Sequence, residues 1–209
     1  MFTRRIGTAI GTAALVGAMF LPGTSAFAQP AANTQTIDSI QSALLRLPYY
    51  GVFDFLAFSY DKGTVTLTGY VYRPGLKNDA ERVVKRVAGV DQVVNQIEAL
   101  PLSPGDDTLR WEIYFAIYGD PFLSRYAPGG GMLWGHPHFV PRTLFGSAAR
   151  FPGMEPAGTY PIAIIVKNGR VTLLGSVDSE ADKTTAALKA SQVPGVFKVD
   201  NELEVHKTT

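Results

Sequence analysis

The chain has 209 residues, of which 46% are hydrophobic and 18% charged, and its formal net charge is +1. This balance excludes the capture of a nucleic acid or an acidic bilayer through overall charge, so we expect no nucleic-acid partner. The sequence contains no cysteine. Disulfides, thiolate metal sites, cysteine nucleophiles and the lipid-anchored type of signal-peptide cleavage are therefore excluded.

Residues 1–28 have the pattern of a cleavable signal peptide. A basic start with Arg4 and Arg5 precedes an apolar run from Ile6 to Leu21, and Ala26-Phe27-Ala28 matches the small residues that signal peptidases recognise. We expect cleavage after about Ala28 and export to the periplasm. General secretion is favoured over twin-arginine export, whose fuller pattern is missing. After cleavage, acidic residues outnumber basic ones by one, and no apolar run reaches the ~20 residues of a transmembrane segment.

A helix and a β-hairpin open the first predicted module. One helical face carries Ile37, Ile40, Leu44 and Leu47. A first strand is predicted from Val52 to Tyr60, followed by the turn residues Asp61-Lys62-Gly63. In the second strand, apolar residues and a glycine alternate with polar residues: Val65, Leu67, Gly69 and Val71. This alternation indicates a strand with one buried face.

The first strand differs because apolar side chains fall on both of its faces. Phe53, Phe55 and Ala57 lie on one face, and Val52, Leu56, Phe58 and Tyr60 lie on the other. Burial of one face alone would leave aromatic rings in water. We therefore expect the two modules to pack on each other or on a partner. The alternative is that a few exposed aromatic side chains are tolerated.

A second helix and a last strand complete the module. The helix has one apolar face: Ala80, Val83, Val84 and Val87. Gly89 then supplies the residue that often takes a left-handed conformation where a helix ends. The last strand carries Val90, Val93 and Ile97.

The same pattern recurs at a constant offset of 106 residues. Gly63 to Val71 aligns with Gly169 to Val177, and 14 of the 36 positions from residue 63 to residue 98 are identical to their counterparts. The second copy has its own elements: a helix with Leu109, Ile113, Ala116 and Ile117, a strand from Tyr160 to Lys167, a helix capped by Ser179 with Asp182, Gly195, and a strand with Val196, Val199 and Leu203. We therefore predict an α+β protein with two tandem α-β-β-α-β modules, over residues 37–103 and 106–207. Each module is expected to be a small mixed sheet with two helices on one face.

The repeated pattern Val-x-Leu-x-Gly-x-Val, a helix, Gly-Val and Val-x-Asn resembles the BON domain, named for bacterial osmotically inducible and nodulation proteins. The first copy carries it as Val65, Leu67, Gly69, Val71, Gly89, Val90, Val93 and Asn95, and the second as Val171, Leu173, Gly175, Val177, Gly195, Val196, Val199 and Asn201. The resemblance implies a non-enzymatic module, often in tandem in periplasmic proteins. It also implies an association with phospholipid or envelope attachment and with osmotic or envelope stress.

Gly69 and Gly175 correspond to the glycine that marks the family. A glycine within a strand commonly permits a bulge or a close approach of another backbone, so we interpret both as structural residues rather than ligand contacts. Gly89 and Gly195 are likewise predicted to be structural, at the ends of helices.

A long insertion, about residues 125–159, separates the first helix of the second module from its hairpin. Its composition favours function over disorder, because it is rich in large apolar side chains and arginines. The candidate lipid- or partner-binding residues are Leu133, Trp134, Phe139, Arg142 and Phe145. Arg125 and Arg150 lie in the same segment. Three interpretations stay open: contact with a bilayer interface, docking of a protein partner, or coverage of the exposed sheet face.

No constellation predicts catalysis, a metal site or a cofactor. His136-x-His138 supplies only two metal ligands, with no acidic residue nearer in sequence than Asp120 or Glu155. A Gly-x-Ser-x-Gly elbow and a phosphate-binding Gly-Lys-Ser/Thr motif are missing. Asp106 with Asp107 is interpreted as helix capping and dipole stabilisation.

The sequence therefore predicts a non-enzymatic periplasmic binding protein of the cell envelope. We expect association with phospholipid surfaces in support of envelope integrity or osmotic stress tolerance. The alternative is an interaction or assembly scaffold that docks another envelope protein, through the apolar first strand or the insertion.

Overall fold

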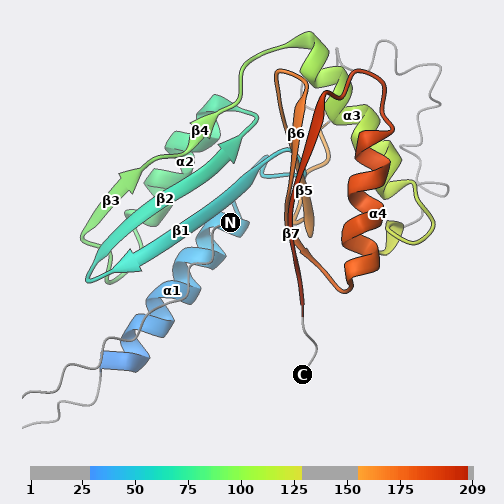
Figure 1. The fold of residues 1–209 in the computed structure, drawn as a ribbon. Coiled ribbons are helices and arrows are strands. Elements are labelled where there is room, and N and C mark those ends of the chain that lie inside the picture. The colour runs from blue at the N-terminus through green and yellow to red at the C-terminus, as the bar shows by residue number, and fades with distance from the viewer. Residues whose placement is uncertain (1–28, 129–154, 207–209) are drawn as a thin grey trace, which may run out of the picture.

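The computed structural model describes residues 29–128 and 155–206. The signal-peptide prediction for residues 1–28 lies outside this part of the chain. Two modules follow each other in sequence, each with helices packed on a small mixed sheet (Figure 1). The predicted α+β fold with two tandem α-β modules is confirmed.

The first module contains α1 (Gln29–Leu45), β1 (Phe55–Asp61), β2 (Thr64–Val71), α2 (Pro74–Val84), β3 (Gln92–Asn95) and β4 (Glu98–Ala99). Strand β2 is central. It pairs antiparallel with β1 and parallel with β3 and β4. Both helices pack on the face of β2 that carries its alternating apolar side chains, Val65, Leu67 and Val71. The shared core contains Ile40, Leu44, Leu47, Val65, Leu67, Val71, Leu76, Ala80, Val84 and Ile97.

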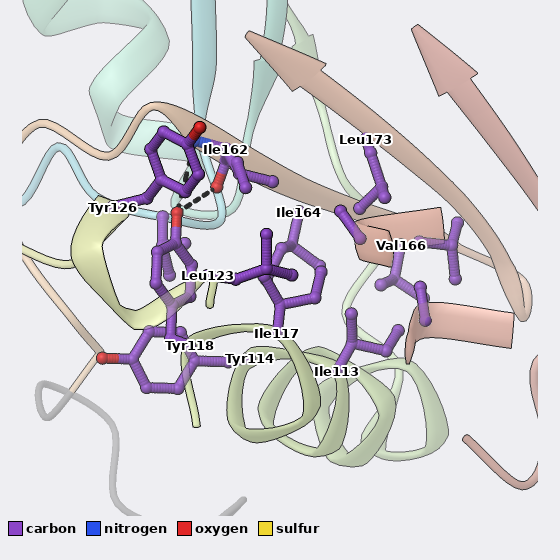
Figure 2. Packing of buried hydrophobic residues seen from close by; sticks show 14 of the residues in the cluster. Ile113, Tyr114, Ile117, Tyr118, Leu123, Tyr126, Ile162, Ile164, Val166 and Leu173 are labelled. Atoms are coloured by element: carbon purple, nitrogen blue, oxygen red, sulfur yellow. Dashed lines mark hydrogen bonds between the residues drawn. The ribbon is translucent and has the colours of Figure 1, made fainter. Parts of the chain in front are cut away.

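The second module repeats this order with α3 (Pro104–Tyr118), a 3₁₀ turn η1 (Ser124–Tyr126), β5 (Ile162–Lys167), β6 (Arg170–Val177), α4 (Glu180–Ser191) and β7 (Lys198–Val205). Strand β6 is central, antiparallel to β5 and parallel to β7. Figure 2 shows Ile113 and Ile117 of α3 packed toward Ile164 of β5. The hydroxyl of Tyr118 donates a hydrogen bond to the carbonyl of Ile162 at 2.7 Å, which fixes the end of α3 to β5.

An asparagine ties the last strand of each module to its second helix. The Nδ2 group of Asn95 donates to the carbonyl of Lys77 at 2.9 Å, and that of Asn201 donates to the carbonyl of Lys183 at 2.8 Å. The Oδ1 atom of Asn95 also accepts the N–H of Ile97 at 3.2 Å. These bonds give the repeated Val-x-Asn pattern a structural role.

The repeated strand glycines lie where two backbones approach closely. Gly69 has φ +119° and Gly175 has φ +117°. A Cβ atom at Gly69 would lie 2.0 Å from the carbonyl oxygen of Phe55, and one at Gly175 would lie 2.0 Å from that of Pro161. Any side chain would therefore push the hairpin strands apart at this point.

Three details differ from the sequence predictions. Ile37 is 38% exposed, because the buried face of α1 is narrower and centres on Ile40 and Leu44. The helices α2 and α4 end at Val84 and Ser191, several residues before Gly89 and Gly195. These glycines, at φ +86° and +93°, instead reverse the chain in the turn that precedes the last strand.

The first strand also begins later than predicted, at Phe55 instead of Val52. The backbone of Val52 bonds outside its own module: its N–H donates to the carbonyl of Pro156 at 3.1 Å, and its carbonyl accepts the N–H of Ile164 at 2.8 Å. Residues 50–54 therefore lie outside the first sheet, and Val52 in this segment bonds to the second module.

Candidate functional site

The predicted binding residues Leu133, Trp134, Phe139, Arg142 and Phe145 lie between residues 129 and 154, outside the described residues. The same holds for His136 and His138. The structure does define the two chain segments that flank this stretch. Both stems of the insertion, up to Pro128 and from Glu155, are anchored on the modules.

The first stem is held against the start of α4. The Arg125 guanidinium forms ion pairs with Asp182 and, at 3.5 Å, with Asp178, and it lies 4.8 Å from the centre of the Tyr126 ring. The Tyr126 hydroxyl donates to Asp182 Oδ2 at 3.0 Å and accepts the N–H of Asp178 at 2.8 Å. Ser179, the predicted cap, accepts the N–H of Asp182 at 3.2 Å. Arg125, one of the arginines of the predicted insertion, therefore holds this stem to the start of α4.

The second stem pairs with the first module. The carbonyl of Pro156 accepts the N–H of Val52, the N–H of Gly158 donates to the carbonyl of Tyr50 at 2.9 Å, and Gly51 forms a β-bridge with Ala157. A Cβ atom on Gly51 would lie 2.3 Å from the carbonyl oxygen of Pro156, so only glycine permits this approach. An ion pair between Arg73 and Glu155 closes the contact.

A buried carboxylate organises this junction. Asp54 is 4% exposed, and its two oxygens accept the N–H of Gly51 at 3.0 Å and the N–H of Tyr72 at 2.7 Å. Burial raises the pKa of Asp54 to about 6, although both N–H donors and the charge of Arg73 oppose the shift. Asp54 is not among the predicted site residues, because it lies inside the predicted strand from Val52 to Tyr60 and a single Asp there gives no sign of burial.

Aromatic side chains join the two modules. Phe53 packs edge-to-face on Trp111 and Tyr114 of α3, with ring centres 5.6 and 6.4 Å apart, and on Tyr72, 6.2 Å away. Val52 and Phe53 are buried within the hydrophobic core of the second module. The expectation that the modules pack on each other is therefore confirmed.

A buried arginine lies beside this aromatic contact. Arg110 is 1% exposed; it pairs with Asp107, donates to the carbonyl of Val166 at 2.6 Å, and lies 5.0 Å from the centre of the Tyr72 ring. Burial lowers the pKa of Arg110, and the carboxylate of Asp107 opposes this shift.

The acidic pair at the start of α3 has two separate roles. Ser103 caps the helix by accepting the N–H of Asp106 at 3.3 Å. The carboxylate of Asp106 instead accepts the N–H groups of Asn168 and Gly169 at 2.8 and 2.9 Å, so it holds the β5–β6 turn. Both acids lie in the first turn of α3, as the helix-dipole part of the prediction requires. The capping part is wrong, because the cap is Ser103, the Asp106 carboxylate binds the β5–β6 turn, and Asp107 pairs with Arg110.

An apolar groove of about 310 Å³ runs between α1 and the edge strand β1. Its lining residues are Gln41, Leu44, Leu45, Tyr50, Leu56, Ala57 and Phe58. Strand β1 pairs with β2 on one side, and among the described strands none pairs with its other edge, which borders the groove. A strand edge beside an apolar wall is the kind of surface to which an extended peptide can add a strand.

The described residues contain no group of three or more His, Cys, Asp or Glu side chains that could hold a metal ion. Among the helices in this part of the chain, none is long and apolar enough to cross a membrane.

A family model described as BON domain matches residues 33–101 and 155–207 of the chain. Two solved structures of CdsD, a structural protein of the type III secretion system of Chlamydia trachomatis, are 14% identical to the chain, one of them its C-terminal domain. They cover 82% and 83% of this chain and 97% and 94% of their own, with TM-scores of 0.26. No curated protein matches.

BON domains are non-catalytic binding domains, and the proteins that carry them are typically periplasmic. The two matched segments fall within the two modules of the fold, and the second begins at residue 155, so it omits α3, η1 and most of the insertion. The chain belongs to the BON domain family and carries two tandem copies of the domain.

Proposed function

We propose that this protein is a non-enzymatic periplasmic binding protein that associates with phospholipid surfaces and supports envelope integrity or osmotic stress tolerance. The proposed contact residues are those of the insertion: Leu133, Trp134, Phe139, Arg142 and Phe145. Because the net charge is close to zero, lipid affinity requires a local patch rather than the overall charge.

The observation that carries the proposal is the anchoring of both stems. Pro128 and Gly158 lie together, since a Cβ atom on Gly158 would be 3.9 Å from Cγ of Pro128. Arg125 and Tyr126 fix one stem to α4, and Pro156 fixes the other to the first module. A segment rich in aromatic residues and arginine thus starts and ends at one fixed place. Tryptophan favours the depth of lipid headgroups, and arginine pairs with their phosphates.

Vesicle co-sedimentation of the chain from Gln29 onward tests the proposal. The probe is a set of vesicles of phosphatidylcholine alone or mixed with phosphatidylglycerol. Binding is expected, with a blue shift of tryptophan emission that disappears in a Trp134→Phe variant, which retains Trp111. The double variant Trp134→Ala with Phe139→Ala should bind vesicles more weakly than the wild-type chain, whereas the control Asp91→Asn should bind as the wild-type chain does. Wild-type chain that stays in the supernatant at low salt would refute the lipid role.

A second candidate function is the docking of an envelope protein, and the groove between α1 and β1 favours it. An extended segment of a partner would add to the edge of β1 and place apolar side chains against Leu44 and Phe58. Cross-linking in periplasmic extract would identify such a partner. The expected result is one stoichiometric partner that Ala57→Lys releases, since the lysine lies in the groove. A wild-type protein that binds vesicles but forms no stoichiometric cross-link would contradict this candidate.

A further inference from the structure

Two large apolar side chains are exposed at one end of the second module. Phe197, before β7, is 84% exposed, and Leu102, before α3, is 79% exposed. The strands β6 and β7 begin at this end, as does α3, at the top of the module in Figure 1. The Asp106 carboxylate connects α3 to the β5–β6 turn here, so both side chains belong to one end of the fold.

The position of Phe197 is fixed by backbone contacts rather than by the core. Its N–H donates to the carbonyl of Gly169 at 2.9 Å. A Cβ atom on Gly169 would lie 2.4 Å from Cδ2 of Phe197, so the ring rests directly on the glycine of the turn. The ring is therefore held outward, although water is an unfavourable environment for it.

Cationic side chains lie on the strands beside this turn: Arg170 pairs in register with Lys167 and with Lys198, the residue after Phe197. Lys167, Arg170 and Lys198 have side chains 47%, 60% and 54% exposed. Lys167 pairs with Glu98, and the other two pair with Asp200. Exposed ion pairs are weak in water, so these cations remain available to a more strongly anionic surface.

The first module provides an internal comparison. Five surface positions of this end are Lys167, Asn168, Arg170, Phe197 and Lys198 in the second module, and Asp61, Lys62, Thr64, Asp91 and Gln92 in the first. These five positions sum to three positive charges in the second module and to one negative charge in the first. The carboxylates of Glu98 and Asp200, which pair with the three cations, lower the balance at the second module's end to one positive charge. Asp91 covers Gly63 as Phe197 covers Gly169, so the two ends share a backbone and differ in chemistry.

We propose that this end of the second module is a membrane contact, in which Phe197 and Leu102 enter the interface of a bilayer and Lys167, Arg170 and Lys198 meet anionic phospholipid headgroups. This contact rests on the proposed lipid-binding function and is independent of residues 129–154. A protein interface would need roughly 800 Å² from each partner, which two separated side chains on turns do not supply. A bilayer needs only apolar side chains that penetrate it and cations at headgroup depth.

The test uses the full chain from Gln29 onward and vesicles of phosphatidylcholine with and without phosphatidylglycerol. Phe197→Ser should weaken vesicle affinity about tenfold, since the variant lacks the aromatic ring that the bilayer would bury. Three single variants each remove one positive charge: Lys167→Gln, Arg170→Gln and Lys198→Gln. Each should weaken binding to the anionic vesicles about fivefold, and added salt should also weaken that binding. The matched control is Phe122→Ser, which removes a ring 71% exposed elsewhere on the module and should leave affinity unchanged.

A spectroscopic measurement locates the contact directly. Because the chain has no cysteine, Phe197→Cys, Asp91→Cys and Phe122→Cys each accept a single environment-sensitive fluorophore. Anionic vesicles should shift the emission to the blue at position 197 and leave it unchanged at positions 91 and 122. If the wild-type chain binds vesicles while Phe197→Ser has no effect and the label at 197 stays in water, the contact is wrong and the lipid function stands. If the wild-type chain binds no vesicle, both fail together.

Discussion

Phe53 of the first module and Trp111 of the second lie edge-to-face, with ring centres 5.6 Å apart and an angle of 76° between the rings. Phe53 precedes β1 in sequence but is buried in the second module's core. The insertion's second stem passes beside the same segment, through the pairing of Gly51 with Ala157. One segment, residues 50–54, thereby couples the two modules to the base of the proposed binding segment.

Truncation of Phe53 should therefore destabilise the whole chain. Phe53→Ala is expected to lower the free energy of unfolding by about 3 kcal/mol or more, because a buried ring and its edge-to-face contacts are lost. Urea denaturation in a Trp134→Phe background reports it through Trp111 fluorescence. The control Phe122→Ala, at a ring 71% exposed, should change stability by less than about 0.5 kcal/mol. Equal effects of the two variants would contradict this role of Phe53.

The strand glycines should tolerate no side chain. Gly69→Ala and Gly175→Ala combine a strained φ with a Cβ placed 2.0 Å from a carbonyl oxygen, so each should cost about 3 kcal/mol or more. Gly75→Ala is the matched control, since a Cβ there meets no atom within 4 Å and α2 gains helix propensity, worth up to about 1 kcal/mol. Thermal unfolding of the three variants tests both expectations: a lower melting temperature for Gly69→Ala and Gly175→Ala, and an unchanged or higher one for Gly75→Ala. A stable Gly69→Ala chain would show that the strands can separate without loss.

Most of the fold followed from the sequence because its elements repeat with clear periodicity. Val65, Leu67 and Val71 alternate as a half-buried strand requires, and they are buried as predicted. Val52 and Phe53 were assigned to the same strand as Phe55, because an apolar residue looks alike whether it faces its own sheet or a distant helix. Their partners, Pro156 for Val52 and Trp111 for Phe53, lie far downstream and follow no pattern. Only the three-dimensional arrangement joins them.

The candidate site was less predictable for a related reason. Arg110 stands between Leu109 and Trp111 in an amphipathic helix, where a lone arginine normally faces water. Its burial depends on Asp107, the carbonyl of Val166 and the ring of Tyr72, which come from three different elements. The sequence near Arg110 gives no sign of Val166 or Tyr72, which are far away along the chain. The only local sign is the spacing of Asp107 and Arg110, since residues three apart meet on a helix.

Loss of Arg110 should destabilise the junction. Arg110→Ala leaves the carbonyl of Val166 without this donor and the half-buried Asp107 carboxylate without its cation, so we expect a loss of about 3 kcal/mol in the free energy of unfolding. Arg82→Ala provides the control, because Arg82 pairs with Asp79 on an exposed helix face and should contribute less than about 1 kcal/mol. Urea titrations of both variants give the comparison. An Arg110→Ala chain as stable as Arg82→Ala would show that the buried pair contributes nothing.

The pH dependence of stability should reveal Asp54. Its pKa is raised from 3.8 to about 6 by burial, so the folded chain favours the protonated form. The sign follows from linkage: this contribution is fully present below pH 4 and is lost as the pH rises through 6. A difference of about two pKa units corresponds to about 3 kcal/mol in total, of which about 1 kcal/mol falls between pH 5 and pH 7.5. Denaturant midpoints should therefore be lower at pH 7.5 than at pH 5.

The variant Asp54→Asn shows how much of the pH dependence of stability comes from the Asp54 carboxyl group. Asparagine keeps an oxygen that can accept the N–H of Tyr72 but carries no charge, so most of the difference between pH 5 and pH 7.5 should disappear. A smaller slope of the same sign should remain, because burial also raises the pKa of Asp107. Asp38→Asn, at an exposed position on α1, should leave the profile as it is in the wild-type chain. If Asp54→Asn retained the full slope, the junction carboxylate would be ionised throughout this range, and the hydrogen bonds from Gly51 and Tyr72 would outweigh the cost of burying its charge.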